Sequence, residues 1–112
     1  MRVLRIRYRL WIEKDGRPVL GKGGAELLRA IKEEGSLSAA ARKLGMSYVF
    51  AWEYVHRIQT TLGSPVVEAR RGGRQGGSTT LTETGEKLLR LYEEAEKAVE
   101  QVLRRIMGEV TL

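Results

Sequence analysis

The stretch GSLSAAARKLGMSYVFAW, residues 35–52, constrains the fold most, because it encodes two short helices in immediate succession. Ser36 is a good N-cap, since its hydroxyl can accept a hydrogen bond from a free backbone N–H of the first turn. A glycine ends the first helix, and Ser47 can cap the second. The first helix has a small apolar face made of Leu37, Ala40, Ala41 and Leu44. The pattern predicts helices over 37–44 and 48–62 joined by a tight turn, which is a helix-turn-helix.

The second of these helices has two different faces. An apolar stripe at helical spacing is predicted to point inward: Tyr48, Ala51, Trp52, Val55, Ile58 and Leu62. In a helix-turn-helix, this helix can enter the major groove of duplex DNA with its N-terminal residues toward the base edges. The candidate sequence-reading residues are Tyr48, Val49, Phe50, Glu53 and Arg57. Of these, Arg57 lies about two and a half turns farther on and is expected to reach the DNA backbone rather than the bases. Ser36, Ser38 and Ser47 are further candidate DNA contacts.

The segment before this unit predicts a hairpin and a helix. Residues 4–13 alternate between apolar and mostly charged side chains, which predicts a half-buried strand. Asp15-Gly16 is a type I′ turn signal, and Pro18 restricts the returning strand, 17–20, to a sheet edge. Arginines on the outer face of such a strand more often solubilise it than contact phosphates. A helix is predicted over 24–34, with Leu27, Leu28 and Ile31 as its apolar stripe.

A second hairpin is predicted after the helix-turn-helix. Residues 66–71 and 78–82 form its strands, and the glycine-rich stretch GGRQGG forms its tip. A hairpin in this position is a wing. Its candidate DNA contacts are Arg70, Arg71, Arg74 and Gln75, because glycine allows close approach to a groove and arginine supplies positive charge. A phosphate-cradling nucleotide loop is the weaker alternative, since the order G-x-x-x-x-G-K-[ST] is missing.

The last part of the chain predicts one long helix, over 83–107, with Thr82 as its N-cap. Its apolar residues recur at steps of four and three, as in the seam of paired helices: Leu88, Tyr92, Ala95, Val99, Val102 and Ile106. The stripe could instead pack on the chain's own core, but a small body cannot cover so long a helix. We therefore expect one structural unit, with a winged helix-turn-helix body over 1–82 and a C-terminal dimerisation helix over 83–112.

Positive charge is concentrated in the body. The formal net charge is +6 over 112 residues. Residues 1–82 hold 15 Lys and Arg against 7 Asp and Glu, whereas residues 83–112 hold 5 against 7. A basic body suits double-stranded DNA, because neutralised phosphates release counterions. A heat-stable protein that is merely rich in arginine is the alternative.

Composition argues against several other classes of protein. No apolar run approaches the roughly 18 residues that span a bilayer, arginines interrupt the N-terminus, and the chain has no cysteine. We therefore expect a cytoplasmic protein without membrane contact, disulfide or cofactor. His56, the only histidine, lies one turn from Glu53, but such pairs are usually surface contacts. A second histidine or a cysteine for a metal site is missing, so the sequence does not predict an enzyme.

The order of these motifs resembles the N-terminal DNA-binding domain of ModE-type molybdate-responsive transcription regulators, from about residue 12 to residue 92. The motifs that carry the resemblance are GSLSAAARKLGMSY, AW, the glycine-rich wing and LTETGEKLL. The core GSLSAAARKLGMS alone is shared more widely, with LysR-type regulators. The resemblance implies an α+β, mainly α, winged helix-turn-helix with an N-terminal hairpin and a long C-terminal helix. It also implies a homodimer joined through its N- and C-terminal segments.

Two departures from the ModE pattern matter. ModE-type regulators usually continue into a pair of oxyanion-binding domains, and this chain stops where they would begin, so no molybdate site is expected in it. The family commonly has basic residues after MSY, where this sequence has Val49 and Phe50. These side chains could pack on thymine methyl groups, or they could mark a helix that contacts protein. Two functions therefore remain: a homodimeric DNA-binding transcription regulator, favoured by charge and wing, and a winged-helix protein-interaction module.

Overall fold

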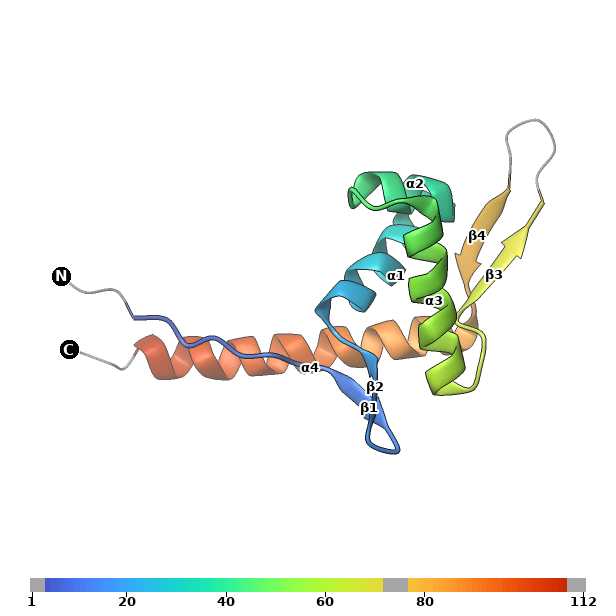
Figure 1. The fold of residues 1–112 in the computed structure, drawn as a ribbon. Helices are drawn as coiled ribbons and strands as arrows, with labels where there is room; N and C mark the ends of the chain where they lie inside the picture. Colours follow the sequence, from blue (N-terminus) through green and yellow to red (C-terminus); the bar gives the residue numbers. More distant parts are fainter. Residues whose placement is uncertain (1–3, 72–76, 109–112) are drawn as a thin grey trace.

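The computed structural model describes residues 4–71 and 77–108, and over them the fold is α+β and mainly α (Figure 1). The elements are, in order, β1 (Ile12–Lys14), β2 (Arg17–Leu20), α1 (Lys22–Glu34), α2 (Leu37–Lys43), α3 (Tyr48–Leu62), β3 (Val67–Arg70), β4 (Ser78–Leu81) and α4 (Glu83–Gly108). The strands form two separate two-stranded antiparallel sheets, β1 with β2 and β3 with β4. The four predicted helices and the three later strands are confirmed, with bounds shifted by two residues at most.

Helix α1 is the centre of the core. Its residues Leu27, Leu28 and Ile31 have 0% of their surface exposed, as the predicted stripe requires. Helices α2, α3 and α4 all pack against α1, and α4 runs along the base of the body and extends beyond it (Figure 1). Each large apolar side chain buried in this way stabilises the fold by roughly 1.5–3 kcal/mol. The other helices are therefore positioned by their contact with α1.

The starts of α2 and α3 form as the serines predict. Gly35 adopts the left-handed conformation, with φ of 75°, and ends α1. The Ser36 Oγ then accepts a hydrogen bond from the Ala39 N–H at 2.9 Å. The Ser47 Oγ accepts from the Phe50 N–H at 3.1 Å. The two predicted serine N-caps are confirmed, and they fix the residues at which these two helices begin.

Replacing Ser36 by alanine should lower the free energy of unfolding by about 1 kcal/mol, because the Ala39 N–H loses its acceptor. Ser38→Ala is the matched control, since Ser38 is exposed on the same helix. This control should stay within about 0.5 kcal/mol of the wild type. Urea denaturation followed by circular dichroism measures both variants. Equal losses in the two would contradict the capping role of Ser36.

The β1–β2 hairpin turns as predicted. Asp15 and Gly16 have φ angles of 51° and 78°, both positive, as a type I′ turn requires. The side chain of Lys14 donates to the Leu62 carbonyl oxygen at 2.6 Å. A cation at the C-terminal end of a helix interacts favourably with the free carbonyls there. The hairpin is thus tied to the end of α3.

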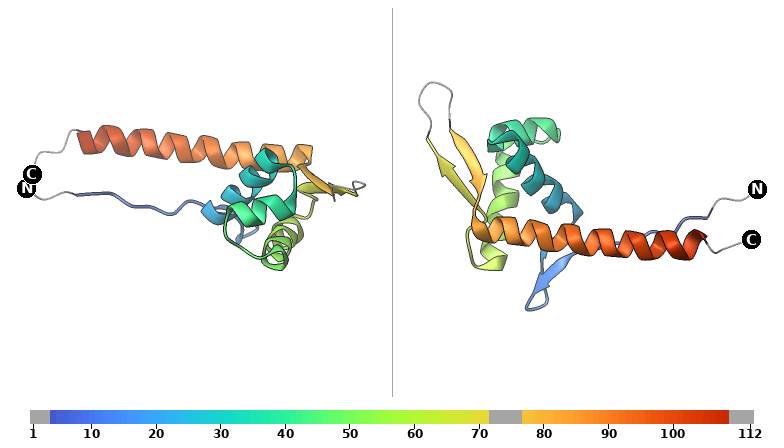
Figure 2. Two further views of the ribbon diagram at one scale, coloured as in Figure 1. Left: turned by 90° about the horizontal axis from the view of Figure 1, so that it is seen from above. Right: turned by 180° about the vertical axis from the view of Figure 1, so that it is seen from behind.

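The strand predicted over 4–13 is wrong for most of its length. Only Ile12–Lys14 is strand, because its partner β2 pairs with these residues alone. In the described part of the chain, residues 4–11 have no neighbouring strand, so their alternation has no ladder to join. The segment instead extends along α4 (Figure 2), where the Tyr8 hydroxyl donates to Glu100 Oε1 at 3.3 Å. Leu10 is half-buried and packs against the core. Four other large apolar side chains of the segment remain exposed: Leu4, Ile6, Tyr8 and Trp11.

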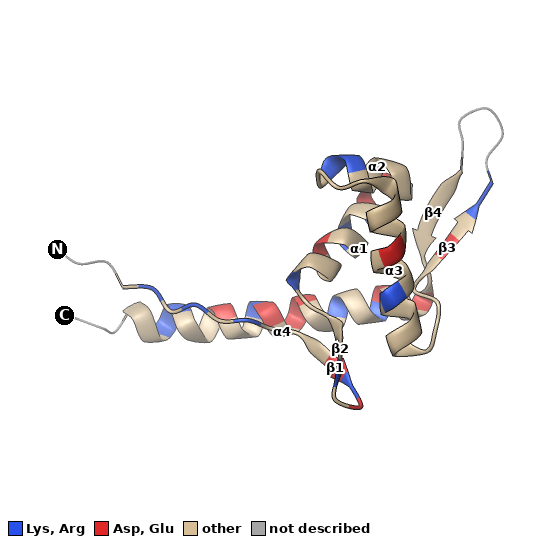
Figure 3. Ribbon diagram, viewed as in Figure 1, with Lys and Arg blue, Asp and Glu red and all other residues tan. Residues whose placement is uncertain are grey.

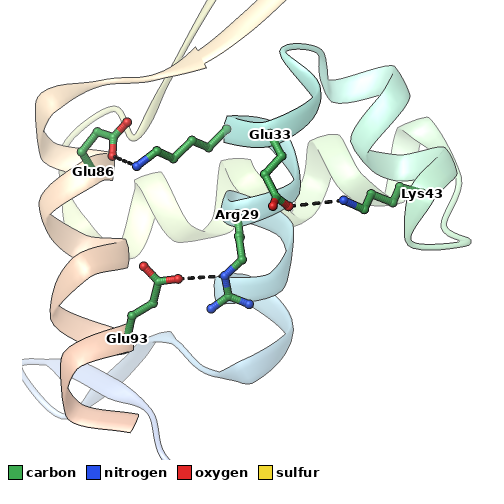
Figure 4. Close-up of polar contacts among 6 residues, drawn as sticks. Arg29, Glu33, Lys43, Glu86 and Glu93 are labelled. Atoms are coloured by element: carbon green, nitrogen blue, oxygen red, sulfur yellow. Dashed lines mark hydrogen bonds and ion pairs between the residues drawn. The ribbon is translucent and has the colours of Figure 1, made fainter. Parts of the chain in front are cut away.

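Ion pairs join α1 to α4 beside the apolar contact (Figure 4). Arg29 Nε donates to Glu93 Oε2 at 2.8 Å, and Lys32 Nζ donates to Glu86 Oε2 at 2.8 Å. The hydrogen bond to Glu93 raises the pKa of Arg29. All four side chains keep about a third or more of their surface exposed. Each pair therefore contributes at most about 1 kcal/mol, and its main effect is on how α4 is aligned along α1.

Helix α4 changes its environment along its length. Leu88, Leu89 and Tyr92 are buried in the core, at 7%, 2% and 2% exposure. Farther along, Val102 and Ile106 are exposed at 44% and 42%. Two of the predicted seam residues, Leu88 and Tyr92, therefore pack in the chain's own core and not on a free face of α4. The other four do not belong to that core: Ala95, Val99, Val102 and Ile106.

Candidate nucleic-acid interface

One cleft joins the starts of α2 and α3 to the β3–β4 hairpin. Its volume is about 410 Å³. Five of the predicted DNA contacts line it, and they come from three separate segments: Ser36, Ser38, Tyr48, Arg70 and Arg71. The fold therefore brings the beginnings of two helices and the basic end of strand β3 onto one face.

The hairpin is held against the helix-turn-helix by hydrogen bonds at both strands. Thr79 in β4 is a buried polar residue, 7% exposed. Its N–H donates to the Gly35 carbonyl oxygen at 2.9 Å, and its hydroxyl oxygen accepts from the Leu37 N–H at 3.3 Å. Just before β3, the Val66 N–H donates to Gln59 Oε1 at 3.0 Å. The position of the hairpin relative to the starts of α2 and α3 is thus fixed.

The buried face of α3 is narrower than the predicted stripe. Ala51, Val55 and Ile58 are buried. Tyr48 and Trp52 are 54% and 50% exposed, so their predicted inward position is wrong. Both side chains lie on the flank of the stripe that faces strand β3, where they line a second cleft of about 140 Å³. The hairpin covers only part of their surface, which explains the exposure.

The exposed side of α3 is apolar at its start and carries charged residues farther along the helix. Val49 and Phe50, in the first turn, are 62% and 49% exposed. The ring of Phe50 meets Tyr54 edge-on, with centroids 6.0 Å apart. The guanidinium of Arg57 lies over the Tyr54 ring, 5.4 Å from its centroid. At about 1.5 Å per residue, Arg57 is too far along the helix to share the first-turn site, and exposed Glu53 lies between them.

Two residues of this face have roles that the sequence pattern does not predict. The sequence suggests His56 only as a partner of Glu53, but its ring stacks on Trp52, with centroids 5.1 Å apart and 5° between the planes. The spacing of four residues between two ring side chains on one helix is the signal that could have indicated this stack. Thr79 has no such signal, because its contacts are with residues more than 40 positions away.

Positive charge lies at the edges of the face (Figure 3). Arg70 and Arg71 are exposed at the end of β3, and Arg42 is exposed at the end of α2. The neighbouring Lys43 pairs with Glu33 at 3.3 Å, and this hydrogen bond raises its pKa. Two predicted wing contacts, Arg74 and Gln75, lie outside the described residues.

The described residues offer exposed aromatic, hydroxyl and guanidinium groups at this face. Among residues 4–71 and 77–108, no group of three or more His, Asp or Glu side chains could hold a metal ion. The helices within those ranges are all too short or too polar to cross a membrane.

A helix-turn-helix followed by a hairpin that is hydrogen-bonded to it defines a winged helix-turn-helix domain. The sequence model of the bacterial regulatory helix-turn-helix proteins of the lysR family matches residues 24–86, more than half of the chain. The chain belongs to this family. The matched range covers nearly all of α1, the whole of α2 and α3, and the β3–β4 hairpin.

Curated relatives confirm the resemblance to ModE-type regulators. The molybdenum-pterin-binding protein MopB of Rhodobacter capsulatus is 44% identical over 84 residues, which are 75% of this chain and 31% of MopB. The molybdenum transport protein ModE of Azotobacter vinelandii is 32% identical over 114 residues, covering 99% of this chain and 42% of the relative. The DNA-binding transcriptional dual regulator ModE of Escherichia coli is 36% identical over 67 residues, which are 60% of this chain and 26% of that relative. The chain therefore carries a ModE-like helix-turn-helix domain and spans less than half the length of these relatives.

Solved structures share the fold. The CbnR DBD in complex with DNA has a TM-score of 0.58 at 21% identity, covering 75% of this chain and 91% of that one. The BenM DBD in complex with catB site 1 DNA has a TM-score of 0.58 at 20% identity, covering 79% of this chain and 94% of that one. At these identities the likeness shows a common winged helix-turn-helix fold.

Proposed function

We propose that this chain is the DNA-binding part of a homodimeric transcription regulator, which recognises duplex DNA through α3 and the β3–β4 hairpin. The observation that carries the proposal is the common face formed by the starts of α2 and α3 with Arg70 and Arg71. Phosphate binding needs positive charge and free N–H donors on one side, and base recognition needs an exposed helix start. The presence of a DNA-binding regulator among the relatives supports the same assignment.

In this proposal the hairpin supplies attraction that does not depend on base sequence. Arg70 and Arg71 contact phosphates or enter the minor groove, and Arg74 and Gln75 add to this interaction. Glu53, exposed on the second turn of α3, accepts a hydrogen bond from cytosine N4. Arg57, held over the Tyr54 ring, reaches the DNA backbone rather than the bases.

Arg71→Ala should weaken binding to all DNA sequences alike, because an interaction with phosphate carries no sequence information. The slope of log affinity against log salt concentration should flatten by about 0.9 for each phosphate that the variant no longer neutralises. Fluorescence anisotropy titrations at several salt concentrations measure both quantities. Arg90→Ala, at an exposed arginine on α4, is the matched control and should leave the slope unchanged. If Arg71→Ala keeps both its affinity and its slope, the hairpin is not a DNA-binding element.

The proposed homodimer uses the apolar side of α4 that the core leaves free. Leu91 is 55% exposed, and the apolar series continues from it at helical spacing through Ala95, Val99, Val102 and Ile106. Residues 83–112 then act as the dimerisation helix of the body formed by 1–82. In such a dimer the two α3 helices should lie about 34 Å apart, or a multiple of this distance, and the operator should be an inverted repeat.

A winged-helix protein-interaction module is the second candidate. It is favoured by the apolar start of α3, where Val49 and Phe50 are 62% and 49% exposed. Selection of bound fragments from random DNA, followed by titration at several salt concentrations, separates the two functions. An inverted repeat that binds less tightly as salt rises supports the regulator. Failure to bind any duplex at low salt favours the protein-interaction module.

A further inference from the structure

The side chains in the first turn of α3 expose almost no hydrogen-bonding groups. The Ser47 Oγ is already the acceptor for the Phe50 N–H, at 3.1 Å. The side chains of Tyr48, Val49 and Phe50 are 54%, 62% and 49% exposed, whereas Ala51 is buried. The Tyr48 hydroxyl is the one polar atom among these three exposed side chains. Any partner of this turn must therefore be recognised mainly by apolar contact.

Only one base edge in the major groove offers an apolar group, the C5-methyl of thymine. An apolar side chain placed against a donor or an acceptor removes water without replacing the hydrogen bond, which costs free energy. Against a methyl group, the same side chain gains favourable burial. We propose that Val49 and Phe50 are specificity-determining residues that select thymine methyl groups. The inference rests on the proposed function, since α3 must lie in the major groove.

Phe50 is held in place before DNA binds. Its ring packs edge-to-face on Tyr54, with 6.0 Å between centroids and 77° between planes. Tyr54 is half-buried and packs against the core. Because this contact restricts the Phe50 ring, binding loses less side-chain entropy than it would for a free ring. A rigid apolar surface of this kind suits a target as small and fixed as one methyl group.

The surroundings of this turn favour DNA over an apolar protein surface. The cleft beside Tyr48 is lined by Arg70 and Arg71. Phosphates flank every thymine methyl in a duplex, so this arrangement of a cationic edge beside an apolar helix start is complementary to a groove. Glu53, the carboxylate on the next turn of α3, matches cytosine N4 rather than a phosphate.

The test uses the duplex that the protein selects from random DNA. Each thymine of a half-site is replaced in turn by deoxyuridine, which removes the C5-methyl and keeps the O4 acceptor and the base pairing. Fluorescence anisotropy at one salt concentration gives the affinities. At one thymine or more per half-site, loss of the methyl group should weaken wild-type binding about fourfold, the value of one buried methyl-sized group.

Variants identify the side chains responsible. Val49→Ala and Phe50→Ala, with circular dichroism to verify folding, should bind the thymine duplex less tightly and lose the preference over deoxyuridine. Val49→Thr, which keeps the shape and replaces one methyl by a hydroxyl, should weaken this preference, because only one of the two methyl groups remains to contact the thymine methyl. Thr60→Ala, at an exposed residue near the end of α3, is the control and should keep the preference.

The outcomes separate this inference from the proposed function. Equal binding with and without every methyl group, or selection without a preferred sequence, overturns the role of Val49 and Phe50. Salt-dependent binding to DNA would still support the regulator in that case. Failure to bind any duplex overturns both.

Discussion

Gly85→Ala should lower the free energy of unfolding by about 1–3 kcal/mol, the usual cost of forcing an extra methyl group into a packed site. The loss is expected although alanine is the better helix former. Gly85 is buried in the first turn of α4, and an added Cβ would overlap the carbonyl oxygen of Val66. Val66 is 0% exposed, and that oxygen accepts from the Thr82 N–H at 3.0 Å. The clash is with backbone, so the start of α4 or of β3 has to move.

Gly108→Ala is the matched control for this prediction, because it is the same change in the same helix with nothing within 4 Å of the new Cβ. It should stay within about 0.5 kcal/mol of the wild type. Thermal and urea denaturation of the two variants measure the difference. A stability of Gly85→Ala equal to or above that of wild type would mean that α4 can shift away from Val66 without loss.

Local signals explain why so much of the helical fold can be predicted. A cap or a helix stop depends on residues within one turn, as at Ser36, Ser47 and Gly35, so the sequence contains all the partners. The same holds for the turn at Asp15 and Gly16. The wing strands are also predictable, because the glycine-rich stretch GGRQGG separates their two short segments.

Features that depend on distant contacts cannot be predicted in this way. The alternation over residues 4–11 is typical of a strand, but a strand needs a neighbour, and β2 pairs only with Ile12–Lys14. Tyr48 and Trp52 fit the helical period of the stripe, yet their exposure is decided by how much of α3 the hairpin covers. Periodicity indicates a face of a helix and does not indicate where the neighbouring element ends.

The candidate site also combines features that local signals predict with a feature that depends on distant contacts. The starts of α2 and α3 follow from their caps, and Arg70 and Arg71 from the wing pattern. The common cleft cannot be predicted from such local signals, because it depends on the hydrogen bonds by which Thr79 joins the hairpin to Gly35 and Leu37. The proposed dimer seam is a similar case. Leu88 and Tyr92 fit its spacing, but they are buried in the chain's own core.

The free part of α4 leads to the prediction of largest effect on assembly, that Val102→Glu converts the proposed dimer into a monomer. Val102 is 44% exposed in the single chain, so the folded domain tolerates a carboxylate there. In a paired seam the same carboxylate would be buried near its symmetry mate, without a partner of opposite charge. Such a burial costs several kcal/mol unless the helices separate.

Sedimentation tests this prediction directly. The wild type should sediment at twice the chain mass of 12.6 kDa, and Val102→Glu should sediment at the chain mass. Gln101→Glu adds the same carboxylate one residue away, at an exposed position off the seam, and should remain a dimer. Because a dimer binds two half-sites at once, Val102→Glu should also lose most of its preference for an inverted repeat over a single half-site. A wild type that is monomeric at micromolar concentration would contradict the seam, and with it the reason to expect a two-fold operator.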